Sequence, residues 1–200
     1  MIPLFAELCA GTGALALRLE GGPRARPPVS RMGSKWGYGQ VIFTCLGIRA
    51  GSGARRYLFC EPDPGCRLLL YSYTDPGIRE AAAEVIRGWS VEESDPRALW
   101  ERLRAEGPLI APTPREVARW MLWRAWSGPD ASLQHGITDG WMGPRIFADG
   151  SRHHKSIGGI ARDIATLPTL PADITPDART VDPREVARWM LWRAWSGPDA

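Results

Sequence analysis

The sequence predicts an α/β fold in which a partial sheet is flanked by many helices. Two short apolar runs, 2–8 and 56–60, predict strands, and an acidic residue lies at the end of each run, Glu7 or Glu61. Most of the remaining chain has helical spacing or helix-capping signals, which predicts the helices. A length of 200 residues with 44% hydrophobic residues fits one domain with a sizeable core.

The first half of the chain alternates strands, turns and helices. A glycine-rich turn follows the first strand, and a loop rich in Gly, Pro and Arg spans 21–33. A second turn, at 51–53, precedes the second strand. Apolar residues at helical spacing predict the helices of this half. These helices span 14–20, 36–46, 64–73 and 76–89.

Two helices in the middle of the chain are predicted from their end signals. Asp95 is an N-cap candidate, the proline after it suits the first helical position, and Gly107 ends that helix. Thr113 and Glu116 form a capping box, in which each side chain bonds a free backbone N–H group at the start of a helix. Another helix therefore begins after Thr113.

Two irregular segments surround the last predicted helix. Residues 127–155 are rich in glycine and are expected to form a loop. A helix is expected over 156–167, and a proline-rich connector follows over 168–181. These patterns divide the chain into a strand–loop–helix region, 1–75, and a helical region, 76–200.

An 18-residue segment occurs twice without a single change, at 114–131 and at 183–200. Structural repeats normally drift at surface positions, so the identity indicates a recent duplication, an artificial copy or a sequence that long selection has not shaped. The segment is apolar on nearly every side and contains Trp120, Trp123 and Trp126 in its first copy. A buried helix is the main interpretation. The alternatives are a Trp/Arg surface that stacks on bases and an interface between the two copies.

Composition limits the function classes. The net charge of +3 permits contact with nucleic acid without arguing for it. The four cysteines form no Cys-x-x-Cys pair, and the histidines lack partners at metal-ligand spacing, so no metal site is predicted. Signal-peptide features and membrane-length apolar runs are absent from the sequence. We therefore expect a cytoplasmic protein that does not cross a membrane.

The first strand leads into the pattern Glu7-x-Cys9-x-Gly11-x-Gly13, followed by a predicted helix. Glycines let the backbone approach a ligand closely, and a helix start offers free N–H groups. The spacing differs from the Gly-x-Gly-x-x-Gly fingerprint, which disfavours a nicotinamide cofactor. It resembles the first motif of S-adenosylmethionine-dependent methyltransferases. That resemblance implies a Rossmann-like sheet and a loop around the methionine part of the cofactor.

The second strand ends at another acidic residue, Glu61. In nucleoside-binding α/β folds, an acid at this position accepts hydrogen bonds from ribose hydroxyls. Glu61 is the main candidate for this role and Asp63 the second. The alternative is that Glu61 is a solvated residue at the end of a strand.

A third segment, Arg31-Met-Gly-Ser34-Lys35, resembles a cofactor-contacting segment of the Dam-like DNA adenine methylases, which here includes phage-type relatives. In those enzymes it usually precedes the glycine-rich loop, whereas here it follows. A further acidic segment, which includes Asp177, resembles the one that contacts the cofactor's adenine. The resemblance implies S-adenosyl-L-methionine as cofactor and DNA as a partner. The implied cofactor-binding residues are Glu7, Cys9, Gly11, Gly13, Arg31, Ser34, Lys35, Glu61 and Asp177.

The catalytic motif of these methylases, Asp/Asn/Ser-Pro-Pro-Tyr/Phe, is missing. The only Pro-Pro pair is Pro27-Pro28, which has neither an acid before it nor an aromatic residue after it. Without that motif the target amino group of a flipped base is not positioned for attack. We therefore expect a cofactor-binding protein with weak or no catalysis. The alternative is a non-catalytic module that binds protein or nucleic acid through its Trp/Arg-rich helices.

Overall fold

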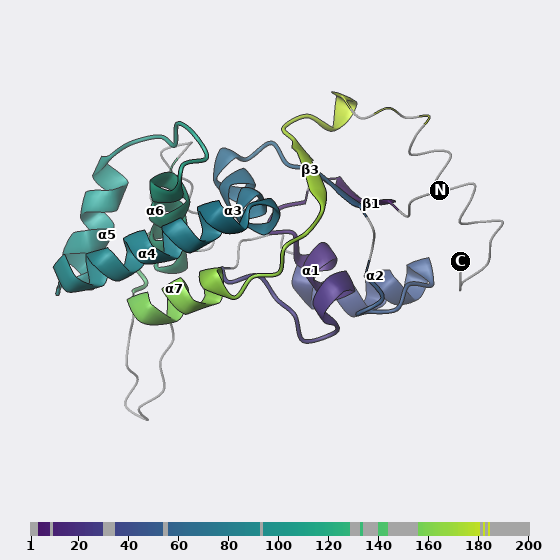
Figure 1. Cartoon of the computed structure of the whole chain (residues 1–200), viewed down its shortest axis with the longest axis horizontal. Helices are drawn as coiled ribbons and strands as arrows, with labels where there is room; N and C mark the ends of the chain where they lie inside the picture. The colour runs from purple at the N-terminus through teal and green to yellow at the C-terminus, as the bar shows by residue number, and fades with distance from the viewer. Residues whose placement is uncertain are drawn as a thin grey trace.

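The structure is a computed structural model that describes residues 4–8, 10–29, 35–53, 56–92, 94–128, 133, 140–143, 156–180, 182 and 184. In chain order its elements are β1 (Leu4–Leu8), α1 (Ala14–Gly21), η1 (Lys35–Tyr38), α2 (Gly39–Leu46), β2 (Arg56–Cys60), α3 (Pro64–Thr74), α4 (Pro76–Glu92), α5 (Pro96–Ala105), α6 (Pro114–Ala125), α7 (Ile157–Ala165), β3 (Ala172–Thr175) and η2 (Ala178–Thr180), where η denotes a 3-10 helix. Figure 1 shows α4 to α7 gathered to one side of the sheet, while α1 and α2 lie below it.

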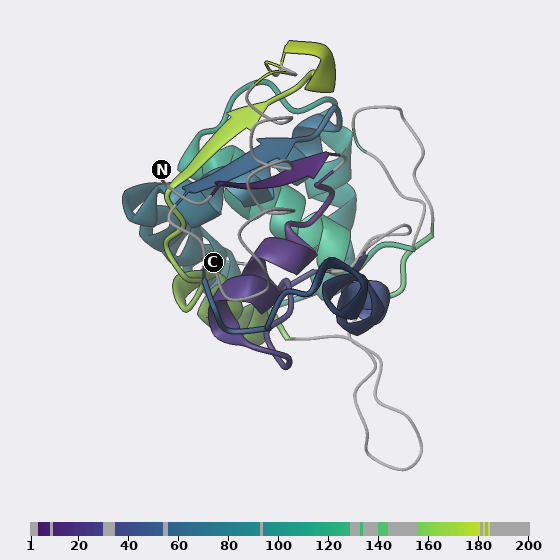
Figure 2. The ribbon, with the colours of Figure 1, turned by 90° about the vertical axis from the view of Figure 1, so that its right-hand side faces the viewer.

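The sheet within the described residues has three parallel strands in the order β1-β2-β3. Figure 2 shows the strands side by side. Leu8 pairs with Cys60, and Cys60 pairs with Thr175, so the carboxyl ends of all three strands lie at the same edge. The α/β class predicted from the sequence is confirmed. The two predicted strands are also confirmed over their described residues.

The third strand corrects the sequence analysis, which assigned 168–181 to an irregular connector. Residues 172–175 form β3, which pairs with β2. Ala172 and Ile174 pack against the hydrophobic core, while Asp173 between them binds Arg56 at the surface with a distance of 2.6 Å. Four residues with one apolar–polar–apolar alternation, next to prolines, are too short a pattern to distinguish from a connector.

The helices α5 and α6 begin directly after their predicted capping residues, Asp95 and Thr113, and α7 is capped by Ser156. The side chains of Asp95, Thr113 and Ser156 accept hydrogen bonds from backbone N–H groups in the first turns of α5, α6 and α7. One start differs from the prediction, because the segment expected to be helical from residue 36 begins as the 3-10 helix η1, and α2 starts only at Gly39. The capping residues in the sequence therefore located the starts of α5 and α6 correctly.

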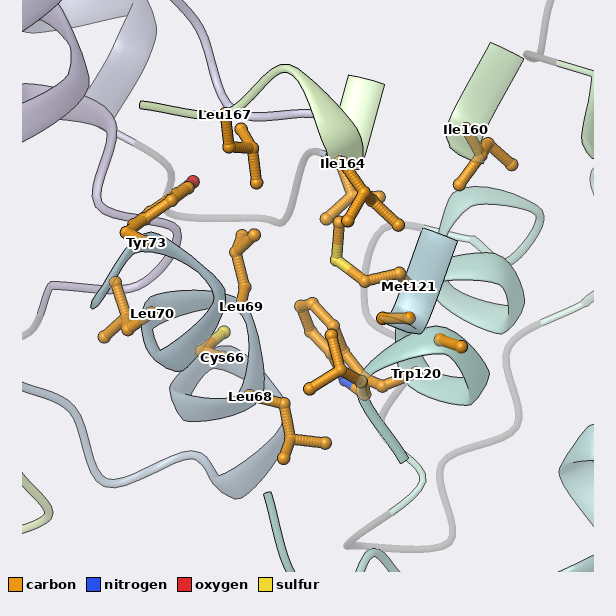
Figure 3. Packing of buried hydrophobic residues seen from close by; sticks show 14 of the residues in the cluster. Cys66, Leu68, Leu69, Leu70, Tyr73, Trp120, Met121, Ile160, Ile164 and Leu167 are labelled. Carbon is orange, nitrogen blue, oxygen red and sulfur yellow. The ribbon is translucent and has the colours of Figure 1, made fainter. Parts of the chain in front are cut away.

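The hydrophobic core runs from α1 and β2 through α3 to the helices α4, α6 and α7. Figure 3 shows Leu69 of α3, Met121 of α6 and Ile164 of α7 converging, and all three are fully buried. Trp120, against the first turn of α3, keeps only 3% of its surface exposed. The core cluster draws residues from both sides of the predicted division at residue 75, and so does the sheet.

Four tryptophans pack against one another in and beside the hydrophobic core. The rings of Trp100 and Trp123 stack with centroids 6.4 Å apart, and Trp141 contacts Trp100 and Trp126 edge to face. Trp123 and Trp126 are fully buried. The first copy of the repeat thus forms a buried helix over Pro114–Ala125, as the main interpretation predicted. The second copy lies outside the described residues except for Arg184.

No helix in the described part of the chain is long and apolar enough to cross a membrane.

Candidate functional site

The loop between β1 and α1 needs glycine for two different reasons. Gly11 and Gly13 both have left-handed φ angles, 58° and 64°, which other L-residues adopt at a cost. A Cβ atom at Gly13 would lie 2.9 Å from the Tyr73 ring, so packing also excludes a side chain there. A Cβ atom at Gly11 would meet no atom of the described residues within 4 Å. Gly13 therefore serves packing, whereas Gly11 leaves open space at the loop.

Contacts from β2 and α3 hold this loop in place. The N–H of Ala10 donates to the carbonyl of Cys60 at 2.9 Å, at the carboxyl ends of β1 and β2. The hydroxyl of Tyr73 donates to the carbonyl of Thr12 at 3.0 Å. These bonds satisfy loop backbone groups that burial would otherwise leave unpaired.

Glu61 connects the end of β2 to the glycine loop. Its carboxylate accepts hydrogen bonds from the N–H of Gly11 at 2.5 Å and from the N–H of Asp63 at 3.0 Å. Only 5% of Glu61 is exposed, so it is not a solvated residue at a strand end. Its own N–H donates to the carbonyl of Thr175 at 3.0 Å, which ties the same point to β3. Glu61 therefore lies where all three strands end.

Glu7 is the buried acid of the site, with 2% of its surface exposed. One carboxylate oxygen, Oε2, accepts a hydrogen bond from the N–H of Ala16 in α1 at 3.2 Å. The other, Oε1, has no hydrogen-bond partner among the described residues, although Lys35 Nζ lies 3.9 Å away. Burial raises the pKa of Glu7 to about 7, against the opposing effects of Lys35 and of backbone N–H groups of α1. The charge of Glu61 raises the same pKa further.

Lys35 reaches this acid from η1, 28 residues further along the chain. Its side chain is 28% exposed, so it stands between the buried carboxylate and the surface. The structure thus brings together Glu7, Gly11, Lys35 and Glu61 at the carboxyl edge of β1 and β2. Of the other predicted residues, Cys9, Arg31 and Ser34 lie outside the described residues.

Asp177 comes two residues after β3, beyond the same edge of the sheet. Its carboxylate pairs with a nearby arginine. It pairs with Arg179 at 2.8 Å, and this hydrogen bond lowers the pKa of Asp177. Among the described residues no contact joins Asp177 to Glu7 or Glu61. Asp63, the second candidate for a ribose acceptor, is the N-cap of α3 and accepts a hydrogen bond from the N–H of Cys66 at 2.8 Å.

Arg67 is a residue of this edge that sequence reasoning missed. Its Nη1 donates to the carbonyls of Glu61 and Pro62 at 2.9 and 2.6 Å. It therefore fixes the turn that presents the Glu61 side chain. The available signal was its position one turn into α3, directly after the acidic strand end, where a long side chain can reach back to that turn.

The chemistry of the site is that of hydrogen-bond and charge recognition. Two buried carboxylates and one lysine surround a loop that is open at Gly11. No group of three or more His, Cys, Asp or Glu side chains in the described residues could hold a metal ion. Comparisons with protein-family models, with curated proteins and with solved structures found no match.

Proposed function

We propose that the carboxyl edge of β1 and β2 binds S-adenosyl-L-methionine in the manner of a Dam-like DNA adenine methylase. The observation that carries this proposal is the convergence of Glu7, Lys35 and Glu61 around the glycine loop. The strand order β1-β2-β3 supports it, because one half of a doubly wound Rossmann-like sheet has this order. In such sheets, ligands bind beyond the carboxyl ends of the strands.

Two features of the site fit a cofactor of this kind. The open space at Gly11 allows a ligand to approach the loop backbone, which a side chain there would obstruct. No described residue donates a hydrogen bond to the buried Oε1 of Glu7, and an unpaired buried oxygen is costly. A ligand with positively charged donor groups, as in S-adenosyl-L-methionine, would supply one.

Each residue has a distinct part in this proposal. Glu61 would accept hydrogen bonds from the ribose hydroxyls, the role of an acid at the end of this strand in nucleoside-binding α/β folds. Glu7 would face the charged methionine part of the cofactor. Lys35, beside Glu7, would contact the same part of the cofactor. The proposed contacts of Cys9, Arg31, Ser34 and Asp177 rest on the family resemblance alone.

Such a cofactor supplies an electrophilic methyl group when it is bound. The sequence has no Asp/Asn/Ser-Pro-Pro-Tyr/Phe motif to position an adenine amino group. We therefore propose cofactor binding with weak or no methyl transfer, and DNA as the partner class that the resemblance implies. The alternative, an interaction module that works through its Trp/Arg helices, has less support because Trp120, Trp123 and Trp126 of the first copy are buried.

Calorimetric titration with S-adenosyl-L-methionine tests the proposal. We expect the parent protein to bind the cofactor, and Glu61→Gln to bind it at least tenfold more weakly. This substitution keeps the size of the side chain and removes the charge. The matched control is Asp173→Asn, which makes the same change on the neighbouring strand at a surface carboxylate that is 58% exposed. Equal affinity for the parent and Glu61→Gln, or no binding by the parent, contradicts the proposal.

A second assay separates binding from catalysis. We expect incubation of the protein with methyl-labelled cofactor and adenine-containing DNA to leave the DNA essentially unlabelled. Sustained labelling would show that residues other than the missing motif position the target base, and would overturn the expectation of weak or no transfer.

A further inference from the structure

Building on the proposed binding of S-adenosyl-L-methionine, we propose that this site releases a proton when it takes up its cationic ligand. The carboxyl group of Glu7 is neutral in the free protein at mildly acidic pH, and it becomes ionised when the ligand binds. The regulation of the site by pH follows from the surroundings of one buried oxygen atom, Oε1 of Glu7.

The burial of Glu7 leaves a negative charge on Oε1 without compensation. Only 2% of the Glu7 surface is exposed, and the other oxygen, Oε2, accepts the N–H of Ala16 at 3.2 Å. No described residue donates a hydrogen bond to Oε1. A buried carboxylate is costly unless it is paired and hydrogen-bonded. The free protein therefore favours a proton on this oxygen.

The charged and titratable side chains that face Glu7 come from three described elements or their ends. Lys35 in η1 lies 3.9 Å from Oε1, which is beyond hydrogen-bond distance, and it is partly exposed to solvent. Glu61, directly after β2, is a second carboxylate of the same edge. In α3, the hydroxyl of Tyr73 donates its single proton to the carbonyl of Thr12, so this proton is not available to Glu7.

The balance of these effects favours the neutral acid. Burial raises the pKa of Glu7 to about 7, and the charge of Glu61 acts in the same direction. The Lys35 ammonium and the N–H groups of α1 lower this pKa, but they do not cancel the effect of burial. Below pH 7, most molecules of the free protein therefore hold a proton on Glu7.

A bound cationic ligand reverses this balance. S-adenosyl-L-methionine carries an ammonium and a sulfonium group against a single carboxylate. An ammonium next to Oε1 supplies both the missing donor and an opposite charge, and each of these favours the ionised acid. The O–H bond of Glu7 then breaks, its electron pair stays on the oxygen, and the proton passes to solvent. With Glu7 ionised, the side chains of Glu7, Glu61 and Lys35 carry one excess negative charge, which complements the excess positive charge of the ligand.

The exchange makes cofactor affinity depend on pH over a defined range. When only the ionised fraction of the protein is competent, the apparent dissociation constant rises as that fraction falls. With the pKa of Glu7 at about 7, binding at pH 5.5 should be roughly tenfold weaker than at pH 7. The α-amino group of the ligand keeps its charge over this range, because such groups titrate at about 7.7–8.0.

Calorimetric titration of the full-length protein with S-adenosyl-L-methionine at pH 5.5, 6 and 7 tests the exchange. Repeating the titration at pH 6 in two buffers with different ionisation enthalpies gives the number of protons released. We expect close to one proton per bound ligand at pH 6 and the roughly tenfold loss of affinity at pH 5.5. Infrared difference spectra at pH 6 should show that binding removes the carbonyl band of a protonated carboxyl group, which distinguishes Glu7 from a histidine.

Two substitutions provide the matched comparison. Glu7→Gln stays neutral, so it should bind more weakly than the parent at pH 7, with the same affinity at pH 5.5 and pH 7. It should release no proton and show no carboxyl band. Glu80→Gln removes an exposed carboxylate of the same type and should behave as the parent does. Proton release that persists in Glu7→Gln would overturn the assignment to this residue.

The failure of the exchange can be distinguished from the failure of cofactor binding. Binding by the parent without proton release, or with equal affinity at pH 5.5 and pH 7, would overturn the exchange and leave the proposed function standing. Absence of binding at every pH would overturn the proposed function and the exchange with it. If Glu7→Gln binds too weakly to be measured, the proton release and the infrared band of the parent decide the outcome.

Discussion

The carboxyl group of Glu7 has a pKa that the fold shifts strongly. Burial moves its pKa from 4.5 to about 7, although Lys35 and the N–H groups of α1 act in the opposite direction. The folded protein therefore binds a proton at Glu7 more tightly than the unfolded chain does. This contribution to stability is complete below pH 4.5 and is lost as the pH rises through about 7.

Glu7→Gln is expected to remove this pH dependence, because glutamine resembles the neutral acid at every pH. The variant should match the parent near pH 4.5 and become more stable than the parent above pH 7, by on the order of 3 kcal/mol. Urea unfolding at pH 5 and pH 8 measures the difference. The exposed Glu80→Gln is the control for loss of a surface carboxylate. A pH-independent effect of Glu7→Gln would contradict the assigned pKa direction.

Two glycines of the same loop are expected to respond differently to alanine. Both Gly11→Ala and Gly13→Ala force a left-handed residue, at a cost of about 1–2 kcal/mol. Gly13→Ala should cost more, because its Cβ meets the Tyr73 ring. Gly47, with φ 61° and no described atom within 4 Å of a Cβ, is the matched control outside the loop. Gly11→Ala and Gly47→Ala should lose similar stability in urea unfolding, but only Gly11→Ala should weaken cofactor binding. Equal cofactor binding by these two variants would contradict the role of Gly11.

At the scale of elements, the sequence predicted what local signals encode. Asp95 and Thr113 cap their helices as expected, because an N-cap depends on residues within one turn. The strand β3 depends instead on pairing between Tyr57 and Ala172, which no local pattern contains. The same reasoning applies to the site. The positions of Glu7 and Glu61 could be predicted because each lies at the end of a predicted strand. The hydrogen bond from Gly11 to Glu61 could not be predicted, because it depends on how the strands pack in the fold.

The contact between α3 and α6 gives a test of helix packing. A Cβ atom at Gly65 would overlap the Trp120 indole, so Gly65→Ala should destabilise the protein by about 1–3 kcal/mol. Gly88 is also helical, in α4, and no described atom lies within 4 Å of a Cβ built there. Gly88→Ala should therefore stabilise the protein by roughly 0.5–1 kcal/mol. Thermal unfolding compares the two variants, and shifts of the same sign would contradict this packing.

At the scale of the whole molecule, the sheet and the core join the two regions predicted from the sequence. β2 from 1–75 pairs with β3 from 76–200, and Leu69 of α3 packs with residues of α6 and α7. Separate fragments would each expose a large part of this core. The division at residue 75 therefore reflects sequence pattern only. We expect the stability of the fold to depend on both regions, 1–75 and 76–200.

Fragments 1–75 and 76–200 are therefore expected not to fold separately. Each should lack a cooperative transition in urea when followed by circular dichroism, because the fragments lose the contacts that β3 and α6 make across the division. An equimolar mixture should regain helical signal. A cooperative transition for 1–75 alone would show that this region has a sufficient core of its own.

The pairing of β2 with β3 also affects the order of events during synthesis. Tyr57 leaves the ribosome long before Ala172, its partner in the sheet. Until then the newly made chain presents one edge of β2 without its native neighbour, and a strand edge of this kind can pair with other chains. Slow translation between these two residues would prolong that interval, so the yield of native protein should be sensitive to translation speed and to the chaperones that bind nascent chains.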